Sequence, residues 1–173
     1  MSGPPSTRWL SNGRDSAAVE IRAVLTALST TPKQIVRLTR GSDDRRLHRK
    51  PAADAWSVHE IVAHLRVCAD VWGRSIERML NEEHPTIRYV SPRGWIRKTD
   101  YLHQDFHDSL RVFANQRVTL VKALRGLDSI DWSRGATFTG TTLGREATVM
   151  GYARRIADHE AQHLGQIRRT IQT

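Results

Sequence analysis

The sequence predicts an all-α protein, a four-helix bundle with long loops between its second and third helices and between its third and fourth. Four stretches carry apolar residues at three- and four-residue spacing, which is typical of amphipathic helices. No segment alternates apolar and polar residues for long enough to indicate a sheet. A chain of 173 residues suits one domain. We expect a flexible N-terminal arm over residues 1–14 and a single domain over residues 15–173.

The first helix is predicted from about Asp15 to Arg40. Val19, Leu28 and Ile35 are among the apolar residues that recur along it at helical spacing. Because Pro32 lacks an N–H donor and clashes with the preceding turn, we expect a break or a kink there.

The start of the second helix carries the clearest local signal in the chain. Ser57 can cap the helix, Glu60 can reach back to the backbone of Ser57, and Trp56 can pack on Ile61. The apolar stripe that follows contains one polar residue, His64. A polar group on an inward face needs a partner, so His64 is a candidate functional residue.

The third helix is predicted from about Tyr101 to Leu127, and the fourth from about Thr142 to the C-terminus. The loops before them, over residues 82–100 and 128–141, contain proline and glycine and are long enough to suggest that they shape a substrate pocket. Their arginines can bind a substrate carboxylate through paired hydrogen bonds or simply carry solvated charge. These arginines are Arg88, Arg93, Arg97 and Arg134.

The fourth helix carries a pair of histidines, His159 and His163, that are four residues apart and therefore share a helix face. With His64 from the second helix they provide three imidazoles for a metal. The alternative is that all three are core histidines that hydrogen-bond to carbonyl groups. A second pair with the same spacing, His103 and His107, is expected to lie at the surface.

Read alone, the segment from His159 to His163 matches the H-E-x-x-H pattern of zinc proteases, in which the glutamate is the general base. The longer protease pattern fails, because Gln166 and Arg169 stand where it needs glycine and histidine, and only ten residues follow His163. A third ligand must therefore come from upstream. Glu160 is either a catalytic base at the metal or a polar residue beside the pair.

The single cysteine, Cys68, excludes an internal disulfide and fits a reducing compartment, which predicts a cytoplasmic location. It lies one turn after His64 and is either a fourth metal ligand or, as we favour, a small buried core residue. Trp56, Trp72 and Trp132 are expected to fill the core. No apolar run approaches the roughly 20 residues of a membrane span, so no membrane partner is expected.

The net charge of +9 admits a nucleic-acid partner. The positive charge is mostly arginine spread along the whole chain, without a recognisable reading motif. A nucleic-acid partner is therefore possible but not favoured.

Two segments resemble the DinB-like (DinB/YfiT-type) metalloenzyme family. Residues 56–65 are similar to its Trp-Ser, glutamate and His-Leu signature, and residues 158–169 are similar to its C-terminal histidine pair followed by Gln-Ile. The run Asp131-Trp132-Ser133-Arg134 resembles the approach to the family's last helix. The resemblance covers residues 15–173.

The resemblance implies a four-helix bundle, often a homodimer, with His64, His159 and His163 as ligands of a divalent metal, commonly zinc or nickel. Some members use a low-molecular-weight thiol. Our leading hypothesis is a metal-dependent enzyme acting on a small molecule, either a thiol-dependent S-transferase or a hydrolase, with open coordination positions at the metal. The alternative is a non-catalytic metal-binding or nucleic-acid-associated stress-response protein.

Overall fold

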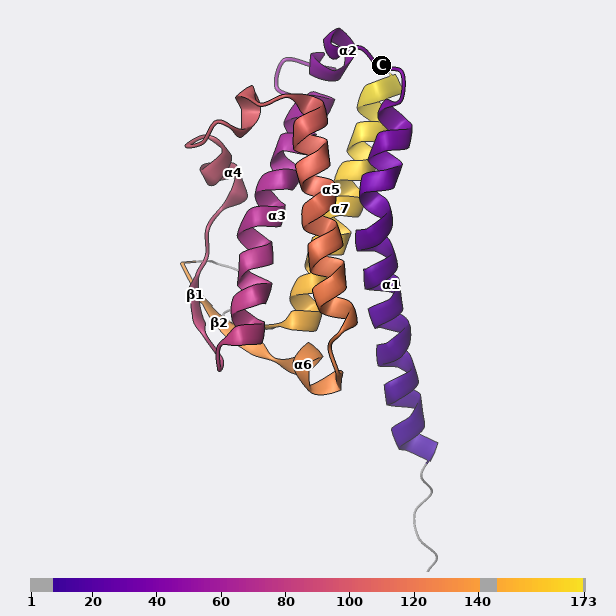
Figure 1. Cartoon of the computed structure of the whole chain (residues 1–173), viewed down its shortest axis with the longest axis vertical. Coiled ribbons are helices and arrows are strands. Elements are labelled where there is room, and N and C mark those ends of the chain that lie inside the picture. The colour runs from indigo at the N-terminus through magenta and orange to yellow at the C-terminus, as the bar shows by residue number, and fades with distance from the viewer. Residues whose placement is uncertain (1–7, 141–145, 173) are drawn as a thin grey trace, which may run out of the picture.

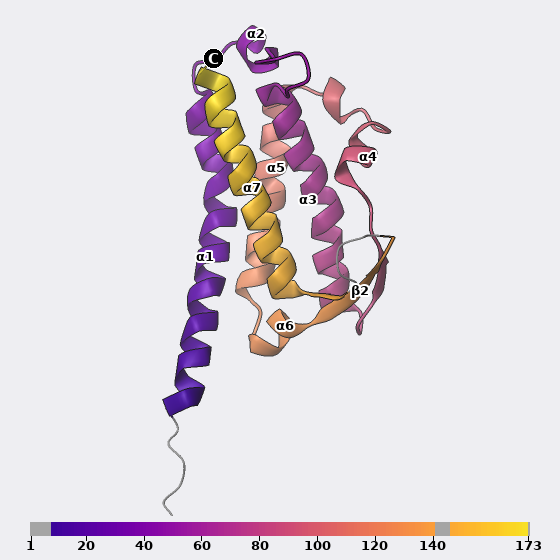
Figure 2. The same cartoon turned by 180° about the vertical axis from the view of Figure 1, so that it is seen from behind.

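Four long helices form an elongated bundle, as the sequence predicts (Figure 1). The computed structural model describes residues 8–140 and 146–172, and for residues 8–14 only the backbone. The long helices are α1 (Arg8–Thr39), α3 (Val58–Asn81), α5 (Phe106–Arg125) and α7 (Val149–Gln172). Helices α1 and α3 each pack against both α5 and α7 (Figures 1 and 2). The first and second long helices therefore lie on one diagonal of the bundle.

Helix α1 differs from the prediction at its start and at its proline. It begins at Arg8, so part of the expected N-terminal arm is helical, and residues 1–7 lie outside the described part of the chain. It also runs through Pro32 without a break. The preceding residue, Thr31, donates its hydroxyl to the carbonyl of Ala27 at 3.0 Å. Both Thr31 and Pro32 are buried, so packing against the bundle outweighs the helix-breaking tendency of proline.

The N-terminus of α3 confirms the predicted capping box. The Ser57 hydroxyl accepts a hydrogen bond from the Glu60 backbone at 3.2 Å, and the Ser57 backbone N–H donates to the Glu60 carboxylate at 2.8 Å. Lys50 adds an ion pair with Glu60 at 2.8 Å. The beginning of the helix that carries His64 is thus fixed by its own sequence.

The two long connections hold more secondary structure than the sequence indicates. Besides the short helix α2 (Asp44–His48) between α1 and α3, they contain β1 (Thr86–Arg88), α4 (Pro92–Ile96), the 3-10 helix η1 (Tyr101–His103), α6 (Ser129–Ser133), β2 (Gly135–Thr139) and β3 (Glu146–Thr148). As a result α5 begins at Phe106 and α7 at Val149, later than the predicted Tyr101 and Thr142. Thr142 itself lies outside the described residues.

The three strands form a small sheet that the sequence did not predict. β2 is central: it pairs in parallel with β1, with Ile87 opposite Phe138, and antiparallel with β3, with Ala136 opposite Ala147. Strands of three to five residues are too short to show alternation, and the β1–β2 pairing joins positions about fifty residues apart. The sheet ties the two long connections together at one end of the bundle (Figure 2).

The core fills the space between the four helices and continues under the sheet. Leu28, Phe113 and Ile156 are fully buried between the helices, and Ile87 and Phe138 extend the apolar core below the strands. None of the described helices is both long and apolar enough to cross a bilayer.

Candidate metal centre

The histidines predicted to bind a metal meet where α3 packs against α7. His64 lies on α3 and is 3% exposed, and His159 and His163 lie one turn apart on α7 and are partly buried. The structure thus brings together all three residues of the predicted site.

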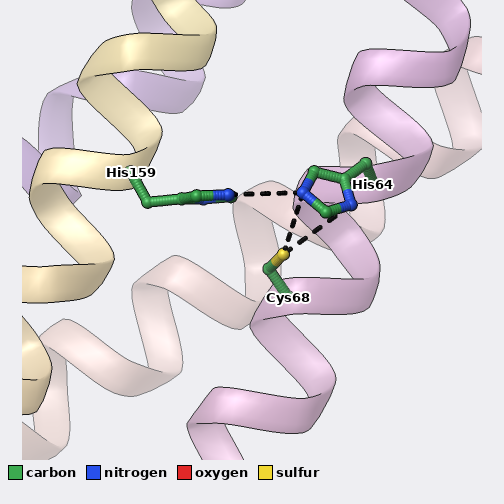
Figure 3. A group of neighbouring side chains, drawn as sticks. All are labelled: His64, Cys68 and His159. Carbon is green, nitrogen blue, oxygen red and sulfur yellow. Dashed lines mark hydrogen bonds between the residues drawn. The ribbon is translucent and has the colours of Figure 1, made fainter. Parts of the chain in front are cut away.

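The three Nε2 atoms gather around His159. Its Nε2 lies 3.3 Å from Nε2 of His64 and 3.1 Å from Nε2 of His163. Cys68, one turn after His64 on α3, places its Sγ 3.4 Å from Nε2 of His64 (Figure 3). In the described part of the chain, the candidate ligand atoms that all lie within 4.8 Å of one another belong to His64, Cys68 and His159, and His163 adjoins this group through Nε2 of His159.

Neighbouring side chains hold the histidine rings in place. Nδ1 of His163 lies 3.0 Å from Oε1 of Gln166, an acceptor, so Nδ1 carries the proton and Nε2 presents its lone pair. Trp56 stacks on His163 with ring centroids 5.9 Å apart, and Trp72 meets His159 edge to face at 4.7 Å. Trp56 and Trp72 therefore pack as predicted, and they pack against the site.

The environment keeps the imidazoles neutral. Burial, followed by the neighbouring histidines and Arg93, lowers the pKa of His64 to about 3. Burial and His163 lower the pKa of His159 to about 4, and burial lowers that of His163. A neutral imidazole carries one N–H and one lone pair, so Nε2 atoms 3.1–3.3 Å apart can share an N–H···N hydrogen bond or, with their lone pairs free, hold a cation between them.

These distances fit a metal ion. With metal–nitrogen bonds of about 2.0–2.1 Å, two ligands of a tetrahedral site lie about 3.3 Å apart. The spacings around His159 are close to this edge. The donor set of neutral imidazoles, with a thiol alongside, suits zinc, nickel or another late divalent metal.

Cys68 lies at the candidate metal centre, although the sequence favoured a core residue without a role in metal binding. It is 2% exposed, as expected for a core residue, yet its sulfur contacts a ring nitrogen of His64. Burial raises the pKa of the thiol, so without a metal it stays protonated. Both predicted alternatives, core residue and fourth ligand, are compatible with this position.

Glu160 faces away from the metal centre. Its side chain is 2% exposed, and Oε1 lies 2.5 Å from Nε of Arg117 on α5, which is equally buried. Burial raises the pKa of Glu160 to about 7, against the opposing effect of Arg117. This placement favours the alternative in which Glu160 is a structural residue beside the histidine pair, and its role as a catalytic base stays a prediction.

A cavity of about 650 Å³ opens beside the histidines. His64, Trp72 and both histidines of α7 line it, so the candidate metal centre is accessible to a small molecule. The remaining polar lining comes from the segment before α4, from α4 itself and from α7: Tyr89, Ser91, Arg93, Arg154, Arg155, Asp158 and Gln162.

Of the loop arginines singled out from the sequence, only Arg93 lines this cavity. Arg134 instead donates to the backbone carbonyls of Met79 and Glu82 and so caps the end of α3. Arg88 lines a separate cavity, and Arg97 is exposed.

Two further charged residues were missed by sequence reasoning. Arg155 precedes His159 by four residues, a spacing that places both on one face of α7, and this signal was available in the sequence. Arg117 had no local signal, because its partner Glu160 lies on another helix.

The second histidine pair lies at the surface, as predicted. His103 belongs to η1 and His107 to α5, and both are exposed. They therefore do not form a second site on one helix.

The fold and the histidine cluster together define a four-helix-bundle protein with a candidate metal centre. Residues 27–167 match the family model of the DinB superfamily. The chain belongs to this superfamily, which confirms the resemblance seen in the sequence.

Among solved structures, the chain is similar to YfiT from Bacillus subtilis, with a TM-score of 0.77 and 18% sequence identity, over 98% of this chain and 90% of that one. That protein is described as a probable metal-dependent hydrolase with an unusual four-helix bundle topology. No curated protein sequence gives a significant match. At this identity the structural similarity supports the fold.

Proposed function

We propose that His64, His159 and His163 bind a divalent metal, zinc or nickel, and that the protein is a metal-dependent enzyme acting on a small molecule. The convergence of three neutral imidazole nitrogens on one cavity carries this proposal. The description of YfiT as a probable metal-dependent hydrolase favours hydrolysis, and a thiol-dependent S-transfer is the second reaction that such a centre supports.

A bound divalent metal would polarise a substrate carbonyl or lower the pKa of a water or thiol. The chain's own residues prepare the site. Gln166 keeps the proton of His163 on Nδ1, and Trp56 and Trp72 pack against the rings of His163 and His159. The homodimer, the thiol cofactor and the cytoplasmic location stay predictions.

Metal analysis of the purified protein tests the proposal. We expect about one equivalent of zinc or nickel in the wild type and almost none in His64→Ala or His159→Ala. His107→Ala is the matched control, because it removes an exposed histidine and should retain the metal. Equal metal content in all four proteins would refute the metal centre.

Cobalt substitution distinguishes an open site from a closed one. If Cys68 is a fourth ligand, the Co(II) protein shows a sulfur-to-cobalt charge-transfer band in the near ultraviolet that Cys68→Ala lacks. If three histidines alone bind the metal, the two spectra match. We expect matching spectra, since a catalytic centre keeps a coordination position free. A band that depends on Cys68 would favour the non-catalytic, structural role.

A further inference from the structure

The cavity beside the histidines contains two guanidinium groups without a protein counter-ion. Arg155 and Arg93 both line it, and in the described part of the chain no carboxylate lies within ion-pair distance of either. A third arginine, Arg154, is paired with Glu20 of α1. Two of the three cations in this cavity are therefore free to meet a ligand.

Arg155 is held in place by aromatic rings rather than by acids. Its guanidinium carbon lies 5.2 Å from the ring centroid of Trp72, 5.9 Å from that of Tyr89 and 5.8 Å from that of Tyr152. Contacts with ring faces stabilise the positive charge and leave the in-plane N–H donors unused. A guanidinium fixed in this way is prepared to bind a planar or tetrahedral oxyanion through two parallel hydrogen bonds.

Arg93 reaches the same cavity from α4. It lies 5.3 Å from the ring centroid of Trp56, the residue that also stacks on His163. Helices α4 and α7, which are distant in the sequence, thus each place beside the histidines an arginine that packs on aromatic rings.

The position of Arg155 relative to the histidines also suits a substrate-binding role. It lies one helical turn before His159 on the same face of α7, so their Cβ atoms are about 6 Å apart. A small molecule in the cavity can contact both residues at once.

The charge balance of the lining favours an anion. Two unpaired arginines, Arg93 and Arg155, face a single acid, Asp158, even before any metal adds two positive charges. A cavity lined by one sign of charge concentrates ligands of the opposite sign.

We propose that this cavity binds an anionic small molecule, a carboxylate or a phosphate, and that the guanidinium of Arg155 is its main anchor with Arg93 as a second contact. The inference rests on the proposed function in that the ligand's reacting group would then sit at the histidine-bound metal. The anchor itself consists of residues that are present in the chain and is tested separately.

A neighbouring cavity of about 700 Å³ suggests where the rest of the molecule lies. It shares Tyr89, Gly151 and Arg155 with the histidine cavity, and Phe138 and Tyr152 give it an aromatic wall. An anionic group at Arg155 would sit on the boundary between the two cavities. The opposite side of this cavity is polar, since the paired His84 and Glu146 also line it. We therefore expect a ligand with an anionic end and an apolar group that packs on Phe138 and Tyr152.

The test is calorimetric binding to the metal-loaded protein, with inorganic phosphate and succinate as separate probes and neutral succinamide as the control. We expect phosphate or succinate to bind in the millimolar range or tighter and succinamide not to bind. Arg155→Gln should weaken binding by about 10- to 100-fold, the effect of losing a charge-assisted pair of hydrogen bonds.

Arg154→Gln is the matched control, because it removes the same charge from the same helix and the same cavity but takes an arginine that is already paired. We expect less than a threefold change. Arg155→Lys, which keeps the charge but not the planar fork, should lie between wild type and Arg155→Gln, and it serves as the readout if Arg155→Gln folds poorly. The preferred probe identifies the anion as carboxylate or phosphate.

Equal losses in Arg154→Gln and Arg155→Gln, or no binding of either anion to the wild type, would overturn the inference. The same titrations on chelator-treated protein separate the two proposals. If no metal is found yet anions still bind through Arg155, the metal centre fails and the anion site stands. If metal binding depends on His64 but Arg155→Gln leaves anion binding unchanged, the metal centre stands and the anion site fails.

Discussion

Two buried polar groups lie next to each other in the bundle, and their chemistry differs. At the candidate metal centre, the neutral side chains of His64, His159 and His163 bring their Nε2 atoms together beside a cavity. The Arg117–Glu160 pair joins a guanidinium group to a carboxyl group 2.5 Å away and is closed off from solvent. The first group is open to a ligand from the cavity, whereas the two members of the second group are paired with each other.

The difference begins with two consecutive residues. His159 and Glu160 are neighbours on α7, but successive residues of a helix point about 100° apart, so one faces α3 and the cavity and the other faces α5. The H-E-x-x-H motif assigns the two residues to one catalytic site. In the helix, His159 lies at the candidate ligand site, whereas Glu160 pairs with Arg117 in the core.

Removing one partner of the buried ion pair should have the largest effect on stability. Glu160→Met leaves Arg117 charged and unpaired in the core, which should lower the free energy of unfolding by about 3–5 kcal/mol. The double variant Glu160→Met with Arg117→Met should regain most of that loss. Urea denaturation measures both, with metal content in parallel. A stable Glu160→Met protein that has lost its metal or its activity would instead place Glu160 in the metal centre.

Metal removal should have the next largest effect and should act only through the histidines. At a free metal concentration 100 times its Kd, binding to the folded state adds about 2.7 kcal/mol to the free energy of unfolding. Thermal denaturation with and without a chelator measures this difference. We expect it to vanish in His159→Ala and to persist in Glu160→Gln. A chelator effect that survives in His159→Ala would indicate a different metal site.

Acid should destabilise the metal-free protein through the same histidines. The pKa of His64 is about 3 in the folded state and near 6.5 when unfolded, so the unfolded state binds more protons below pH 6.5. The stabilisation is present above pH 6.5 and is lost as the pH falls towards 3. Between pH 7 and pH 5 this loss amounts to about 2 kcal/mol for His64.

The measurement compares wild type with His64→Gln in chelator buffer at several pH values. Burial raises the pKa of Glu160 to about 7, a contribution of opposite sign that is common to both proteins and cancels in the comparison. Parallel pH profiles for the two proteins would mean that His64 is not held in its neutral form.

The smallest expected effect concerns the helix that carries His64. Ser57→Ala removes one half of the capping box and should cost about 1 kcal/mol of stability. Because the core still holds α3 in place, metal content should not change. A proportional loss of metal in Ser57→Ala would show that the cap positions His64 as well as stabilising the helix.

The sequence predicted correctly those features that depend on neighbouring residues or on helical periodicity. The capping box at Ser57, the inward stripe that contains His64 and the spacing of His159 and His163 all follow from neighbouring residues, and the structure brings the three histidines together. The buried environment of Glu160 could also have been predicted from the sequence, since Ile156, four residues before it, and Ile167, seven residues after it, mark the core face of α7.

Other features depend on contacts between distant segments. The parallel pairing of β1 with β2, the capping of α3 by Arg134 and the partnership of Arg117 with Glu160 each join residues more than forty positions apart. No window of sequence contains both partners, so propensity alone did not find them. The continuity of α1 through Pro32 is likewise decided by tertiary packing.

The parallel pairing of β1 with β2 has a consequence for engineering this protein. Each of the two long connections contributes to the small sheet and to the cavities near the metal centre, Tyr89 and Arg93 from the first and Phe138 from the second. If only one connection is grafted into another bundle, its strand loses the backbone partners that set its position. Cavity lining should therefore be exchanged between members of this fold by grafting both connections together.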